Sequence, residues 1–201
     1  MRIALALGST LIAVGIVLVM SQSPLALARS NAAPIAGQIA AVSSPYEACQ
    51  GHEVLPSGTT AIRLSLEAMY GPAVRVRVLR GGELLTSGRR TSGWSRQSVT
   101  VPVEPLPRTF AGVSVCFAIA PADETVDVKG SVGATGSHRG AEVRIEYLRP
   151  GSRSWWSLAP AVARRMSLGR ATSGVWIVVV AAAAMLALAL IVFSLLARAS
   201  A

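Results

Sequence analysis

The stretch that decides the fold runs from Ala61 to Leu85 and reads AIRLSLEAMYGPAVRVRVLRGGELL. Apolar and polar residues alternate along it with a period of two, the spacing of side chains that share one face of a β-strand. The dipeptide Gly81-Gly82 separates two apolar runs. A glycine pair favours a tight hairpin turn, because such turns need positive φ. The stretch therefore predicts strands joined by a hairpin.

The same alternation recurs until Pro150-Gly151. The apolar positions are Ile62, Leu64, Leu66, Ala68, Val74, Val76, Val78, Val99, Val101, Val103, Val113, Val115, Phe117, Ile119, Val126, Val128, Val143, Ile145 and Tyr147. About seven or eight short strands with Gly, Pro and Ser turns between them are typical of a β-sandwich. We expect an all-β fold over residues 47–150, a single sandwich of jelly-roll or immunoglobulin-like type.

Two apolar blocks flank this region and explain why 52% of the residues are hydrophobic. Ile3–Met20 and Val175–Ala197 both lack charged residues. A helix as long as the second block spans about 34 Å, which matches a hydrocarbon core of roughly 30 Å. The sequence therefore predicts a transmembrane helix over 174–197, followed by a short cytoplasmic tail at 198–201.

The first apolar block carries an export signal at residues 1–28. Ala26-Leu27-Ala28 fits cleavage by signal peptidase before Arg29, but the apolar run exceeds the usual length of a signal peptide. A cleaved signal peptide and a retained signal-anchor helix therefore both stay open. Either one places residues 29–173 outside the cytoplasm. Arginines beside the second apolar block favour the opposite orientation, but the first export signal fixes translocation. Residues 29–46 are expected to form a linker.

The chain has two cysteines, Cys49 and Cys116. In an exported chain such a pair predicts a disulfide, with two free buried thiols as the alternative. Cys49 is expected before the first strand. Cys116 alternates with Val115 and Phe117, so the bridge would tie the amino-terminal segment onto a sheet from outside.

Residues 151–173 form a membrane-proximal segment rich in Trp and Arg. Trp155 and Trp156 precede a short helical pattern at 161–168, and the arginines are Arg164, Arg165 and Arg170. Trp favours the headgroup region and Arg reaches lipid phosphates, which predicts an interfacial collar. The alternative is that the Trp pair packs on the base of the sandwich and the arginines are simply solvated.

The exported region is basic, since it holds all 10 acidic residues and all but two of the 19 basic ones. A candidate ligand surface surrounds the hairpin and the loop after it: Arg75, Arg77, Arg80, Arg89, Arg90, Trp94 and Arg96. Guanidinium groups pair with phosphate or carboxylate, and an exposed Trp stacks on a sugar ring. This pattern favours an envelope glycan or anionic polymer as ligand, and the alternative is a solvated β face. Export removes nucleic acid as a partner.

Motifs for catalysis and for metals are missing from the sequence. His52 and His138 are the two histidines, and no second His follows His52 at helical spacing. The Gly-rich stretch Gly130–Gly140 lacks the Lys of a phosphate loop. The acidic residues at 123–127 lack EF-hand spacing. We therefore expect no enzyme activity, catalytic residue, metal or cofactor.

The run Leu148–Arg170 followed by an apolar block, with Ile62–Leu66 and Val76–Gly82 before it, resembles membrane-anchored envelope proteins of GC-rich actinobacteria. The resemblance covers most of residues 48–196. It implies an exported, anchored β domain and no particular activity. The expected function is a non-catalytic binding module at the lipid bilayer. The alternative is an accessory subunit that packs against a membrane-protein partner such as a transporter or a glycosyltransferase.

Overall fold

A computed structural model describes residues 2–43, 45–133 and 140–166. The chain divides into two compact units, Leu25–Pro150 on the one hand and Met1–Pro24 with Gly151–Ala201 on the other. The expected transmembrane segment 174–197 and the tail 198–201 lie outside the described residues.

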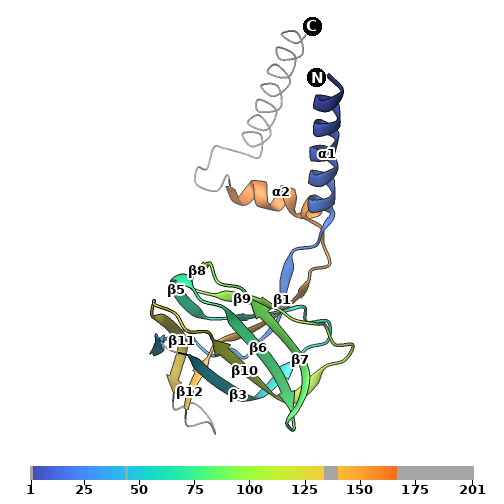
Figure 1. Ribbon diagram of the computed structural model, residues 1–201. Helices are drawn as coiled ribbons and strands as arrows, with labels where there is room; N and C mark the ends of the chain where they lie inside the picture. The colour runs from blue at the N-terminus through green and yellow to red at the C-terminus, as the bar shows by residue number, and fades with distance from the viewer. Residues whose placement is uncertain (1, 44, 134–139, 167–201) are drawn as a thin grey trace. The chain divides into compact units, whose positions relative to one another are not determined.

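The unit Leu25–Pro150 consists of strands, as expected. They are β1 (Leu25–Ser30), β2 (Gly37–Val42), β3 (Tyr46–Leu55), β4 (Ala61–Leu64), β5 (Leu66–Gly71), β6 (Val74–Arg80), β7 (Glu83–Arg90), β8 (Trp94–Arg96), β9 (Val99–Pro102), β10 (Phe110–Ile119), β11 (Val126–Gly133), β12 (Gly140–Val143) and β13 (Ile145–Pro150). Three antiparallel sheets have the orders β1-β13-β4-β9, β3-β10-β6-β7 and β12-β11-β5-β8, and β2 pairs with β11 (Figure 1). The arrangement is sandwich-like, and the jelly-roll or immunoglobulin-like class stays a prediction.

One core fills the space between these sheets. Every apolar position picked out by the alternation is at most 8% exposed. Gly81 and Gly82 form the tight turn between β6 and β7, with φ of 58° and 88°. The predicted hairpin is therefore confirmed, and so is the face that each strand turns inward.

The alternating residues from Ala61 to Gly71 do not form one continuous strand. They form two strands, which belong to two different sheets. β4 ends at Leu64 and β5 begins at Leu66, so the chain changes sheet at Ser65. β12 and β13 change sheet in the same way at Arg144, whose carbonyl accepts a hydrogen bond from Ser65 N at 3.2 Å. The inward-facing residues keep their parity through this corner, so the sequence pattern does not reveal it.

The expected linker at 29–46 is wrong, because this segment contains the end of β1 and the whole of β2. β1 pairs antiparallel with β13, from Leu25 opposite Pro150 to Ser30 opposite Glu146. The β unit therefore begins before the expected cleavage site.

The other unit contains α1 (Arg2–Ser21) and α2 (Trp155–Met166), so the collar helix begins earlier than expected. Two backbone hydrogen bonds join its two chain segments: Gly151 N donates to Pro24 O at 2.8 Å, and Trp155 N donates to Gln22 O at 3.1 Å. In the part of the chain that the structure describes, no helix combines the length and the apolar character needed to cross a membrane.

Candidate binding surfaces

Trp94 is not the exposed sugar platform that the sequence suggested. Its side chain is 6% exposed and belongs to the core. The indole Nε1 donates a hydrogen bond to Pro72 O at 2.6 Å, and the ring lies against Gly71 so closely that a Cβ there would be 2.0 Å from it. The sequence signal for this burial is Gly71-Pro72, whose glycine leaves space for the ring.

The predicted arginines lie in four separate places, three along the hairpin and one in β8. Arg75 and Arg89 are Cα partners on the outward face of β6 and β7, and Arg77 lies two residues further along this face. We call Arg75, Arg77 and Arg89 the hairpin face. Arg77 forms an ion pair with Glu47. Within the described part of the chain, no ion pair involves Arg75 or Arg89, and both side chains are exposed.

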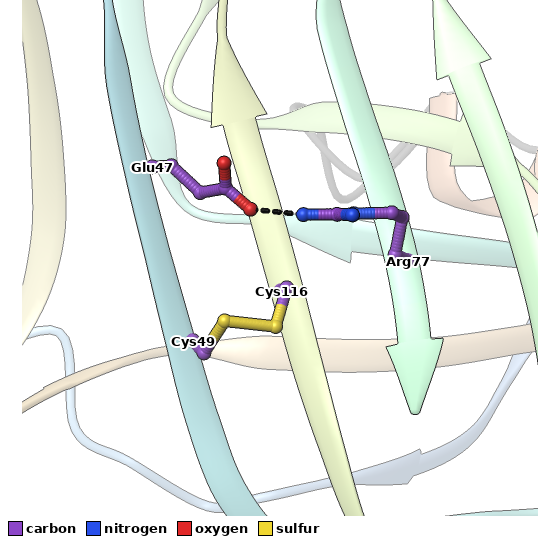
Figure 2. The surroundings of a disulfide bond; sticks show 4 residues. All are labelled: Glu47, Cys49, Arg77 and Cys116. Carbon is purple, nitrogen blue, oxygen red and sulfur yellow. Dashed lines mark hydrogen bonds and ion pairs between the residues drawn. A yellow bond between two sulfur atoms is a disulfide. The ribbon is translucent and has the colours of Figure 1, made fainter. Parts of the chain in front are cut away.

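A disulfide lies on the same side of the sheet as this ion pair. Cys49 in β3 and Cys116 in β10 are directly opposite each other and are bonded, which confirms the predicted bridge. Figure 2 shows Glu47 and Arg77 reaching toward each other across β10 beside it. The location of Cys49 differs from expectation, since the bridge joins two neighbouring strands of one sheet. The disulfide thereby fixes the register of β3 against β10, next to the hairpin face.

Arg80, Arg90 and Arg96 are not part of the hairpin face. Arg80 is at the hairpin tip, where its guanidinium stacks 5.7 Å from the Phe110 ring centre. Arg90 is at the opposite end of β7, paired with Val74. Arg96 lies in β8, and its side chain is outside what the structure describes.

Arg90 lines a groove with a volume of about 700 Å³. We call it the Arg90 groove, and its lining includes Leu25, Thr60, Arg90, Trp94, Ser98 and Thr100. The Trp94 indole N–H is already bonded, so this residue offers only apolar surface. The groove therefore combines one cation, several hydroxyl groups and an apolar wall.

The acidic loop at 123–127 makes protein contacts. The Glu124 carboxylate accepts backbone hydrogen bonds from Met69 N and Tyr70 N, the latter at 2.8 Å. Asp127 lies between Gln38 and Lys129, and the Lys129 hydrogen bond with Glu67 raises the pKa of the Lys129 ammonium. Among the described residues, no His, Cys, Asp or Glu group of three or more could hold a metal ion. His138 lies outside the described residues.

The Trp pair of the membrane-proximal segment is exposed, Trp155 by 41% and Trp156 by 51%. Both stand in the first turn of α2. Arg164 and Arg165 are exposed in its last turn, where cations interact favourably with the helix dipole. Arg170 lies outside the described residues.

A buried polar network was not foreseen from the sequence. Glu53 is 7% exposed, and its carboxylate accepts hydrogen bonds from Tyr147 Oη at 3.0 Å, Gln50 Nε2 at 2.8 Å and Asn31 Nδ2 at 3.3 Å. Burial and the nearby Glu53 charge raise the pKa of Tyr147 well above its usual value. Asn31 Nδ2 also donates to Val143 O, and Asn31 Oδ1 accepts from Ile145 N. The network therefore fastens the segment that follows β1 to the core.

Comparison of the chain with protein-family models, with curated proteins and with solved structures finds no match.

Proposed function

We propose that this chain is a membrane-anchored, exported β module that binds an anionic envelope polymer or glycan without catalysis. The observation that carries the proposal is the pair of exposed arginines Arg75 and Arg89, which are directly opposite on adjacent strands. Like charges in this position repel and destabilise a sheet by a few tenths of a kcal/mol to about 1 kcal/mol. A bound anion removes this repulsion.

The chemistry of the two arginines suits a polymer with repeated phosphate or carboxylate groups. A guanidinium offers a planar fork of donors that binds either anion with two parallel hydrogen bonds. Arg77 adds less, because Glu47 already occupies it. With Trp94 buried, the proposed recognition depends on charge and hydrogen bonds rather than on aromatic stacking.

The proposed membrane anchor is the uncharged block Val175–Ala197, which lies outside the described residues. Of the two fates open to the first block, Ile3–Met20, we propose retention. Cleavage after Ala28 would remove Leu25–Ala28 from β1 and leave β13 without its β1 partners from Leu148 to Pro150. It would also remove Gln22 and Pro24, whose carbonyls accept the hydrogen bonds from the start of the membrane-proximal segment.

The binding part of the proposal is tested on the full chain in a mild detergent. The probes are polyphosphate and polygalacturonate, with a neutral glucan as the uncharged comparison, and affinity is measured by calorimetry. The double variant Arg75→Gln/Arg89→Gln is expected to bind the anionic polymers at least about tenfold more weakly. The matched control, Arg29→Gln/Arg149→Gln, removes the same charge from exposed positions of β1 and β13 and is expected to bind like the wild type.

Equal weakening by both double variants would show that only net charge matters, and the hairpin face would lose its role. Tight binding of the neutral glucan would exclude recognition through anionic groups.

A further inference from the structure

The Arg90 groove lies wholly within the β unit, beside a strand at the end of a sheet. β9 is the last strand of the order β1-β13-β4-β9, and its residues line the groove together with Thr60, Arg90 and Trp94 from other parts of the unit. The volume of about 700 Å³ falls within the range of pockets that hold small molecules, roughly 300–1,000 Å³. The groove is therefore large enough for a sugar ring.

The charge of the groove suits an anion. Arg90 is exposed, and within the described part of the chain no ion pair involves it. None of the described residues that line the groove is acidic. A guanidinium without a carboxylate partner offers its planar fork of donors to a phosphate or carboxylate group of a ligand. Arg90 therefore marks the place for the acidic group.

Hydroxyl groups line the same groove. Ser95 in β8 and Ser98 just after it are exposed. Thr60 Oγ1 is buried and, among the described residues, has no hydrogen-bond partner. The backbone N and O of Thr60 are already bonded to Leu148 and Val103, so only its side chain is left to bind a ligand. Buried hydroxyl groups nearly always have partners, which makes Thr60 an unusual residue beside a groove.

Apolar surface completes the groove. Trp94 and Val99 line it as buried residues, and Pro102 lines it as an exposed one. Packing against Gly71 and the hydrogen bond to Pro72 O hold the Trp94 ring in place. A sugar ring has an apolar C–H face and a rim of hydroxyl groups, whereas a bare phosphate has neither. The groove therefore suits a sugar that carries an acidic group.

From these observations we propose that the Arg90 groove binds one acidic sugar, that is, a sugar ring with a carboxylate or a phosphate group. Arg90 pairs with the acidic group, and Ser95 and Ser98 bind hydroxyl groups of the ring. The Thr60 side chain turns toward the groove, so that its hydroxyl gains the partner that it lacks. Every residue of this site lies in the β unit and none belongs to the hairpin face, so binding there depends neither on membrane anchoring nor on the proposed polymer binding.

Calorimetry on the full chain in a mild detergent tests this site. The probes are galacturonate and galactose 1-phosphate as acidic sugars, with galactose and inorganic phosphate as comparisons. We expect one acidic sugar to bind per chain, at least about tenfold more tightly than galactose or inorganic phosphate. The tighter of the two acidic sugars identifies the acidic group that Arg90 prefers.

Variants of Arg90 test the role of its guanidinium. Arg90→Gln is expected to weaken binding of the acidic sugar about tenfold, because charge-assisted hydrogen bonds are lost. Arg90→Lys keeps the charge without the planar fork and is expected to have an intermediate affinity. The matched control is Arg80→Gln, which removes the same charge at the hairpin tip, at the opposite end of the hairpin from Arg90. This control should bind acidic sugars like the wild type.

Thr60→Val removes the buried hydroxyl and keeps the shape of the side chain. We expect it to bind the acidic sugar about threefold to tenfold more weakly. Its stability in urea should be equal to that of the wild type or higher, because a buried hydroxyl without a partner costs free energy. A Thr60→Val variant that binds the sugar normally and is less stable would overturn the role of Thr60 in binding.

Three outcomes would overturn the proposal as a whole. Equal loss in the Arg80 and Arg90 variants would show that only net charge matters. Inorganic phosphate bound as tightly as the acidic sugars would exclude recognition of the ring. Galactose bound equally tightly would exclude recognition of the acidic group. The proposed function fails separately, in the event that the double variant of the hairpin face binds anionic polymers like the wild type.

Discussion

Tyr147→Phe tests the buried network with a change of one oxygen atom. The substitution keeps the shape of the ring, so it opens no large cavity, but it removes one of the three side-chain donors to the Glu53 carboxylate. Hydrogen bonds to charged groups contribute about 1.5–3 kcal/mol, so we expect the free energy of unfolding to fall by about 2 kcal/mol at pH 7. Urea denaturation of residues 25–150, which hold every described strand and the core, measures it.

The pH dependence of this difference follows from the raised pKa of Tyr147. In the unfolded chain the hydroxyl ionises near the ordinary tyrosine pKa of 10.0, whereas burial keeps it protonated in the folded chain. The stabilisation by protonated Tyr147 is therefore complete below pH 10 and decreases above it, by about 1.4 kcal/mol per pH unit. The wild-type and Tyr147→Phe stabilities should converge near pH 11.5, since about 2 kcal/mol is lost over about 1.5 units.

The matched control is Tyr70→Phe, because Tyr70 is 68% exposed. Its stability difference from the wild type should be small at every pH. A wild-type advantage over Tyr147→Phe that stays constant from pH 7 to 11.5 would refute the burial of the hydroxyl. A Tyr147→Phe variant as stable as the wild type at pH 7 would refute the contribution of the hydrogen bond.

Two further stability predictions concern the core and the disulfide. Gly71→Ala should destabilise residues 25–150 by about 2–3 kcal/mol in urea denaturation, because the new Cβ overlaps the Trp94 ring. The control Gly37→Ala, at a strand glycine with open space around it, should change stability by less than about 1 kcal/mol. Equal effects of the two substitutions would contradict the packing of Trp94 against Gly71. Cys49→Ala/Cys116→Ala should cost about 4 kcal/mol in the chain-entropy account of the loop of 67 residues, and unchanged stability would contradict a restriction of the unfolded chain by the disulfide.

The strand pattern could be predicted from the sequence because burial on one face imposes a period of two. Val74, Val76 and Val78 show it directly, since each is buried between exposed or half-buried neighbours. The changes of sheet at Ser65 and Arg144 were not predictable, because the inward parity continues unchanged through them. β1 and β2 were missed because their Ala-rich sequences carry little alternation, and long-range pairing with β13 and β11 determines their conformation.

The candidate site was predictable in charge but not in geometry. The hairpin turn at Gly81-Gly82 implies that arginines on β6 and β7 face one another, and Arg75 and Arg89 do so. The residues next to Trp94 in the sequence do not indicate its burial, because the space for its ring is left by Gly71 in a distant strand. The Arg90 groove combines Leu25, Thr60 and Arg90 from distant parts of the sequence, so only the folded chain brings its chemistry together.

Retention of the amino-terminal helix keeps the whole of β1 in the mature protein, and the mass of that protein tests the proposed retention most directly. The full chain is expressed in bacteria, extracted from membranes and measured by intact mass spectrometry beside an Ala28→Leu variant that blocks cleavage at this site. Retention predicts that the two masses differ only by the substitution and that both include residues upstream of Leu25. A wild-type mass that corresponds to a chain beginning at Arg29 would contradict it.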